Sequence, residues 1–152
     1  MVTFIGDFEC RADAKGRIVL PATFKKAVEQ DDMRFVVRKH TFENCLVIYP
    51  YNYWEEELAR LRKKLNPYNR EHDKFLRMFF KASAEIALDG NGRFLIPRRL
   101  MDQINGDREF VLLGVDRQIE LWAKEVYDAT ADNSGDFANL AERIMGFDVE
   151  EC

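Results

Sequence analysis

The sequence contains the same pattern twice, and this internal repeat constrains the fold more than any other feature. Residues 8–21 read FECRADAKGRIVLP and residues 84–97 read AEIALDGNGRFLIP, at an offset of 76 residues. The residues that coincide include Asp13/Asp89, Gly16/Gly92, Arg17/Arg93 and Pro21/Pro97. Later apolar segments also match, at offsets that fall to 75 and 73 residues, as short deletions in loops would produce. Because a two-stranded unit is too small to enclose a core alone, the two halves are expected to interlock.

Each half is predicted to contain four strands and one short helix. Alternating apolar residues predict a strand on each side of an Asp-x-x-Gly-Arg turn, in which aspartate accepts backbone hydrogen bonds and glycine supplies a positive φ. We therefore expect each turn to close a hairpin. The proline after the second strand suits the first position of a helix, predicted over about 21–30 and 97–105. Two further strands are expected in each half, near 34–39, 45–49, 109–114 and 118–122.

Helical periodicity occurs between the two halves and after the second half. Apolar residues at three- and four-residue spacings predict helices over 53–65 and 69–82, separated by Asn66-Pro67. The second of these helices has an apolar stripe that favours packing in the core or between subunits, formed by Phe75, Leu76, Phe79 and Phe80. Two more helices are predicted over 123–131 and 136–146.

The charge is unevenly distributed along the chain. The 152 residues have a formal net charge of −4, which by itself would argue against a nucleic-acid partner. Residues 125–152, however, contain eight acids and one arginine, whereas residues 1–124 contain 22 basic and 19 acidic residues. The body of the protein is therefore slightly basic and has to be judged separately. The acidic tail is expected either to compete with DNA for a basic surface or to act only as a solvated extension.

Several classes of protein are not supported by the sequence. No apolar run approaches the ~18–20 residues of a membrane span, and no secretory signal is visible, so we expect a soluble, cytoplasmic protein. The three cysteines lack Cys-x-x-Cys spacing, and Cys10 and Cys45 lie in apolar runs, as small buried residues do. The two histidines, His40 and His72, are far apart. We therefore expect no metal site, no cofactor and no small-molecule substrate.

The duplicated Asp-x-x-x-Arg motifs, each flanked by strands and followed by an apolar pair and a proline, resemble the MraZ family. The resemblance covers residues from about 5 to 128. It implies a bacterial transcription regulator of the division and cell wall gene cluster, built from two AbrB/SpoVT-like halves. It also implies closed rings of protomers that bind short direct repeats upstream of their own operon. The implied partners are double-stranded DNA and other copies of the chain, in the cytoplasm and at the nucleoid.

The resemblance also implies a fold and a division of the chain. The expected class is α+β, with duplicated ββαββα halves interleaved into a pseudo-twofold, swapped-hairpin, AbrB-like barrel with flanking helices. The expected units are a first repeat over 5–54, connecting helices over 55–82, a second repeat over 83–128 and an acidic C-terminal extension over 129–152.

The two turns form the candidate DNA-binding site. Arginine can bond bidentately to guanine, lysine can neutralise a phosphate, and glycine lets a backbone approach closely. The predicted DNA contacts are Arg17, Lys15, Arg11 and Arg93, with Lys25 and Lys26 as unranked supporting cations. Arg93 ranks below Arg17 because its turn has Asn91 where the first turn has a lysine. The residues expected to shape the turns, the aspartates as acceptors or ion-pair partners, are Asp13, Gly16, Asp89 and Gly92.

One alternative function comes from another class. Related interlaced barrels also recognise proteins, so a protein- or peptide-binding β-barrel module without DNA binding is the second hypothesis. Salt distinguishes the two, since phosphate binding weakens steeply with added salt and peptide burial much less. An enzyme is not expected, because no paired carboxylates, nucleophile–base pair or metal cluster is visible in the sequence.

Overall fold

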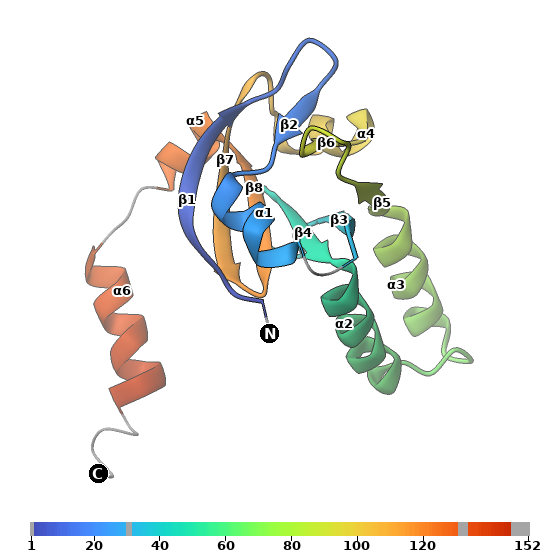
Figure 1. Cartoon of the computed structure of the whole chain (residues 1–152). Helices are drawn as coiled ribbons and strands as arrows, with labels where there is room; N and C mark the ends of the chain where they lie inside the picture. The colour runs from blue at the N-terminus through green and yellow to red at the C-terminus, as the bar shows by residue number, and fades with distance from the viewer. Residues whose placement is uncertain (1, 30–31, 131–133, 147–152) are drawn as a thin grey trace.

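Antiparallel strands from both repeats form the centre of the molecule (Figure 1). The computed structural model of the chain describes residues 2–29, 32–130 and 134–146. Six strands form one sheet in the order β1-β7-β8-β4-β3-β5, and β2 and β6 form a separate two-stranded sheet. The strands are β1 (Phe4–Arg11), β2 (Arg17–Val19), β3 (Arg34–Lys39), β4 (Leu46–Pro50), β5 (Ser83–Ala87), β6 (Arg93–Leu95), β7 (Glu109–Asp116) and β8 (Gln118–Ala123). The predicted strands are therefore confirmed to within a few residues.

The two repeats exchange strands. Strands β1 to β4 of the first repeat correspond to β5 to β8 of the second, and exchanging these names reverses the order of the large sheet. The first strand of each repeat pairs with the third strand of the other repeat, β1 with β7 and β5 with β3. The predicted hairpins are therefore wrong, because each turn joins two strands whose partners lie in the other repeat.

The fold is α+β, as expected, but its sheets do not close into a barrel within the described residues. Strands β1 and β5 are the two edges of the large sheet. Strands β2 and β6 contain three residues each and pair with one another, so they do not join those edges. The closed barrel expected from the resemblance is thus replaced by an open six-stranded sheet with a short ribbon beside it.

Four α-helices lie in connections between strands, and two more follow β8 in the described residues. The α-helices are α1 (Ala22–Val28), α2 (Tyr51–Lys64), α3 (Arg70–Lys81), α4 (Arg98–Met101), α5 (Lys124–Ala129) and α6 (Ser134–Ala141). A short 3-10 turn, η1 (Asp102–Ile104), follows α4, and a π-helical turn, η2 (Glu142–Gly146), follows α6. Pro21 and Pro97 are the N-cap residues of α1 and α4, with non-helical ψ values of 142° and 136°. Each proline therefore lies just before its helix, and the expectation that it would occupy the first helical position is wrong. Residues 131–133 and 147–152 of the acidic extension lie outside the described residues.

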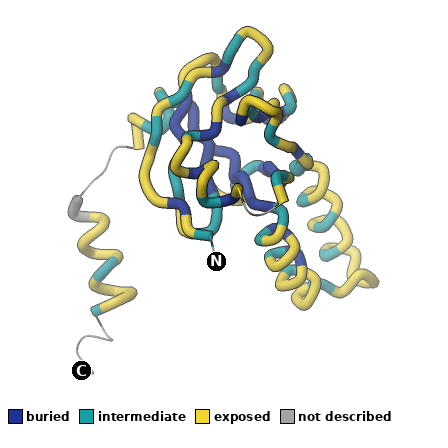
Figure 2. The backbone as a smooth tube through the Cα atoms, viewed as in Figure 1, coloured by how far each residue is buried: buried dark blue, intermediate teal, exposed yellow. Residues whose placement is uncertain are grey.

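The main core lies between the large sheet, the β2–β6 ribbon and the short helices α1 and α4. Both repeats contribute to it, and the rings of Phe35 and Phe94 meet edge to face with centroids 5.0 Å apart. A smaller cluster on the other face of the sheet packs Val36, Val47 and Tyr49 under Trp54 and Leu58 of α2. Figure 2 shows that the buried backbone follows the strands, whereas α3 and α6 are largely exposed.

Two negative observations apply to the part of the chain that the structure describes. No helix there is long and apolar enough to cross a membrane. No group of three or more His, Cys, Asp or Glu side chains there could hold a metal ion. Burial raises the pKa of Cys45 to about 12, so its thiol stays protonated at neutral pH.

Candidate nucleic-acid interface

The first turn is organised by the side chain of Asp13. One carboxylate oxygen, Oδ1, accepts the backbone N–H groups of Lys15 and Arg17, each at 2.9 Å. The other oxygen, Oδ2, accepts Arg17 Nε at 2.7 Å. Gly16 has a φ of +85°, which a residue with a side chain rarely adopts, and its N–H donates to the Asp13 carbonyl at 2.9 Å. A single aspartate therefore fixes both the turn and the direction of the arginine.

The second turn repeats this geometry. Asp89 Oδ1 accepts the N–H groups of Asn91 and Arg93 at 2.8 and 2.9 Å, and Oδ2 accepts Arg93 Nε at 2.9 Å. Gly92 has a φ of +72°. The matched positions found in the sequence thus correspond to matched hydrogen bonds.

These hydrogen bonds keep both carboxylates ionised. The backbone N–H of Arg17, followed by its side chain, lowers the pKa of Asp13 below its ordinary value. The N–H of Arg93 is the main cause of the lowered pKa of Asp89. Each arginine binds its aspartate through Nε, so its terminal nitrogens can still donate to a partner. The side chains of Arg17 and Arg93 are 28% and 26% exposed, which leaves them accessible.

Pairing between β2 and β6 brings the two turns together. Arg17 lies opposite Leu95, and Val19 lies opposite Arg93, while Ile18 and Phe94 between them face the core. The Arg93 guanidinium also comes within 3.9 Å of Asp13 Oδ2, across the ribbon. We call the outer side of this ribbon the β2–β6 surface, defined by Arg17, Val19, Arg93 and Leu95.

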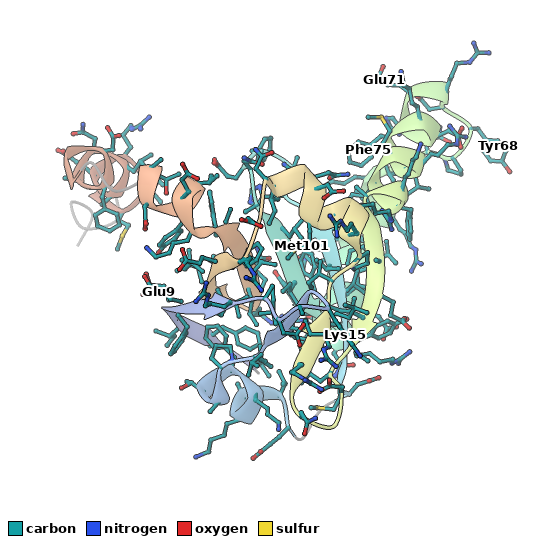
Figure 3. The ribbon with its side chains drawn as sticks, turned by 90° about the horizontal axis from the view of Figure 1, so that it is seen from above. Glu9, Lys15, Tyr68, Glu71, Phe75 and Met101 are labelled. Atoms are coloured by element: carbon teal, nitrogen blue, oxygen red, sulfur yellow. The ribbon has the colours of Figure 1, made fainter. Side chains whose placement is uncertain are left out.

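Each turn is accompanied by one lysine, which comes from a different part of the chain in each case. Lys15 lies within the first turn and is exposed (Figure 3). At the second turn the lysine is Lys25 from α1, because a Cβ added to Gly92 would lie 3.3 Å from its Nζ. At the repeat offset of 76, the counterpart of Lys25 is Met101, so the second repeat does not return a lysine to the first turn. Lys25 was not ranked from the sequence, although the difference between Lys25 and Met101 was visible at this offset.

The other predicted cations are less closely involved. Arg11 is exposed at the end of β1, opposite Glu109. A groove of about 510 Å³ adjoins the first turn, and its lining holds three acids and three basic residues, which are Asp13, Asp102, Asp107, Lys15, Arg98 and Arg108. Lys26 is exposed on α1, and no described contact places it at either turn. The charges along the groove therefore balance, whereas the two turns together with Lys25 carry a net positive charge.

Comparisons with known proteins agree with the duplication. A family model described as "MraZ protein, putative antitoxin-like" matches the chain twice, over residues 3–78 and 78–148. The second match continues past residue 128, where the resemblance was expected to end. Among the relatives, the "Transcriptional regulator MraZ" of Phocaeicola vulgatus is 41% identical over 144 residues, which cover 94% of each chain. That of Bacteroides thetaiotaomicron is 40% identical over 95% of this chain and 94% of its own. That of Desulforamulus reducens is 35% identical over 93% and 97%, respectively.

Proposed function

The chain belongs to the MraZ family, and from this premise we propose that it is a transcriptional regulator that binds double-stranded DNA through its β2–β6 surface. Its relatives are named as regulators, and none of the names quoted above describes an enzyme. The observation that carries the proposal is the pairing of β2 with β6, which places Arg17 and Arg93 on one two-stranded ribbon. A two-stranded antiparallel ribbon is one of the two elements that fit the major groove of B-DNA.

The charges of this surface support an anionic partner. The two turns contribute Arg17, Arg93 and Lys15, and α1 contributes Lys25, against the carboxylates of Asp13 and Asp89, so the net charge is positive. Because the aspartates hold the arginines through Nε, the guanidinium groups are oriented before binding and lose little freedom when DNA arrives. We propose that these terminal nitrogens contact guanine edges and that the two lysines contact phosphates.

The finer parts of the proposal concern the target and the assembly. We propose that the DNA sites are short direct repeats upstream of the division and cell wall gene cluster, including the chain's own gene. We also propose that copies assemble into a ring and act at the nucleoid, in the cytoplasm. The exchange of strands between repeats supports an AbrB-like, interleaved relationship between the halves.

A DNA titration tests this function. Fluorescence anisotropy would follow the binding of DNA from upstream of the gene at several salt concentrations, with unrelated DNA of equal length as competitor. The double variant Arg17→Ala/Arg93→Ala should lose specific binding, whereas Arg70→Ala, which removes an exposed arginine from α3, should bind as the wild type does. Equal binding by the double variant and the wild type would refute the assignment of this surface.

One observation favours a protein partner as the second candidate. Val19 and Leu95 are exposed aliphatic side chains on the same surface. If they are the recognition element, binding to a protein should change little between low and high salt, and Val19→Ser should weaken it more than Arg17→Ala. The salt series therefore separates the two candidates.

A further inference from the structure

A cavity lined by aromatic rings lies between the large sheet and helices α2 and α3. It has a volume of about 410 Å³, and its walls include Tyr49, Trp54, Phe75 and Phe79. The rings of Trp54 and Phe79 stack with centroids 5.7 Å apart, and those of Phe75 and Phe79 lie 6.0 Å apart. Cavities of this size accommodate apolar side chains from a partner. We call this feature the aromatic cavity.

Arg38 gives the aromatic cavity a buried positive charge. Arg38 is only 8% exposed, and its guanidinium lies 4.4 Å from the centre of the Phe79 ring. It donates to the Lys39 carbonyl and to Thr41 Oγ1, both at 2.8 Å. Within the described residues no carboxylate forms an ion pair with it, whereas Glu57 on the same wall is paired with Arg60. Since a buried charge without a counter-ion is costly, the cavity favours an acidic occupant.

The rim of the aromatic cavity is apolar and uncovered. Helix α3 contains no buried residue, and Phe75 is 45% exposed. Phe42, which also lines the cavity, is 87% exposed. Lys64 of α2 also lines the cavity and forms no ion pair in the described part of the chain. The cavity therefore combines open aromatic surface with positive charge.

The C-terminal helical segment has the opposite character. We call residues 134–146, which comprise α6 and η2, the arm. Phe137, Leu140 and Ile144 follow one another at spacings of three and four residues and form an exposed apolar stripe, and Met145 beside them is also exposed. Phe137 and Ile144 are 72% and 71% exposed, and the charged residues of the arm are two acids, Asp136 and Glu142, and one base, Arg143. Thirteen helical residues extend about 20 Å, close to the length of α2 or α3, so the arm is long enough to lie along them.

The arm lies far from the aromatic cavity of its own copy. Helix α5, which precedes it, is tied to β1 by Tyr127 Oη, 2.8 Å from Asp7, and by Lys124 Nζ, 3.3 Å from Glu9. Figures 1 and 3 both show α6 and α3 on opposite sides of the sheet.

We infer that the arm of one copy docks into the aromatic cavity of a second copy. The apolar stripe of the arm then covers the rings of the rim, and the acids of the arm lie near Arg38 and Lys64. Each copy both gives an arm and receives one, so the contact is head to tail and closes into a ring when the rotation per copy permits. This inference rests on the proposed self-association and is independent of DNA binding.

Complementation between two full-length variants tests the contact. Phe137→Ser/Ile144→Ser disables the arm, and Phe75→Ser disables the cavity, where the exposure of Phe75 leaves the fold intact. Sedimentation velocity at low micromolar concentration should show each variant alone as a monomer, at least tenfold weaker in self-association than the wild type. A mixture of the two should form a dimer, because one intact arm then meets one intact cavity. Asn139→Ser and Tyr68→Ser, which change exposed residues outside the stripe and the cavity, should assemble as the wild type does.

The remaining outcomes separate this inference from the proposed function. If the arm variant keeps the wild-type assembly, the arm contact is wrong, and self-association through another surface stands. If both variants dissociate and their mixture stays monomeric, the arm and the cavity do not form one interface, which also overturns the inference. A wild-type chain that is monomeric at high concentration overturns both the arm contact and the ring. The DNA titration with Arg17→Ala/Arg93→Ala decides separately whether the β2–β6 surface binds DNA.

Discussion

The Asp13 carboxylate has more partners than any other side chain of the two turns. It accepts two backbone N–H groups and Arg17 Nε, and it lies 3.9 Å from the Arg93 guanidinium. Asp89 makes the matching contacts within its own turn, and no ion pair in the described residues joins it to Arg17. Asp13 thus connects the two repeats, which its position in the sequence could not reveal because the connection depends on the β2–β6 register.

We predict that Asp13→Ala lowers the melting temperature and reduces the loss of stability in acid. A lowered pKa in the folded state stabilises the protein above the unfolded pKa near 4, and this contribution disappears as the pH falls through the folded pKa. The wild type should therefore lose stability below about pH 4 more steeply than the variant. Thermal melts by circular dichroism between pH 2 and 7 measure this, with Asp107→Ala as the control. If the melting temperatures of Asp13→Ala and the wild type fell equally steeply with pH in acid, the prediction would be contradicted.

The two arginines should contribute unequally to DNA binding. Arg93 lies near two carboxylates, those of Asp89 and Asp13, whereas Arg17 is bonded to Asp13 alone. Arg17→Ala should therefore abolish specific binding, at about 1–3 kcal/mol per base contact in each protomer, and Arg93→Ala should cost less. Titrations of both variants against specific and unrelated DNA measure the difference. The reverse order would place the main DNA contact in the second repeat.

Lys15 and Lys25 should act alike although they lie in different elements. Both adjoin a turn, so each should contribute about one phosphate contact. Lys15→Ala and Lys25→Met should weaken binding to all DNA sequences and reduce the salt slope by about one per contact. Lys26→Met, on the same helix as Lys25, is the matched control. A salt slope that changes for Lys15→Ala but not for Lys25→Met would show that the second turn faces away from the DNA.

The positions of the strands and helices were predicted from the sequence far better than the pairing of the strands. Alternating apolar residues indicated the strands β1 and β5, because successive side chains of a strand point to opposite faces and only one face is buried. The Asp-x-x-Gly-Arg turn was also predictable, since its hydrogen bonds lie within five residues. The partner of each strand was not, because the same turn forms whether the flanking strands pair with each other or with the other repeat. The aromatic stripe of α3 was recognised, but its exposure depends on where α3 lies relative to the sheet.

The pairing of β1 with β7 depends on a close approach at Gly114. This residue lies opposite Gly6, and a Cβ added to it would be 2.5 Å from the carbonyl carbon of Phe4. Because the obstacle is backbone, Gly114→Ala should force the strands apart and destabilise the fold by about 1–3 kcal/mol. Urea unfolding measures the free energy, and Gly90→Ala, with open space around it, is the control. An unchanged midpoint for Gly114→Ala would mean that β1 shifts without cost.

At the scale of the whole molecule, the β2–β6 surface is small. Each strand has three residues, so one protomer can read only a few base pairs and should bind weakly. The acidic segment from 125 to 152, with eight acids and one arginine, does not add to this affinity. Tight binding therefore requires several protomers that face successive sites on the same DNA, each of which raises the effective concentration of the next.

We predict that DNA binding depends steeply on the number and the spacing of repeats in the target. Removing all repeats but one should weaken binding by at least 100-fold, because avidity of this kind is lost when only one site engages. Moving one repeat by about 5 base pairs, half a helical turn, should weaken it similarly, since the moved site then faces away from its protomer. A shift by a full turn of about 10 base pairs keeps the site on the same face and should cost less. Anisotropy titrations on these DNA fragments, run beside sedimentation of the free protein, give both quantities. A monomer that binds a single repeat as tightly as the full array would rule out the assembly-based account, because the small β2–β6 surface would then have to supply the entire affinity.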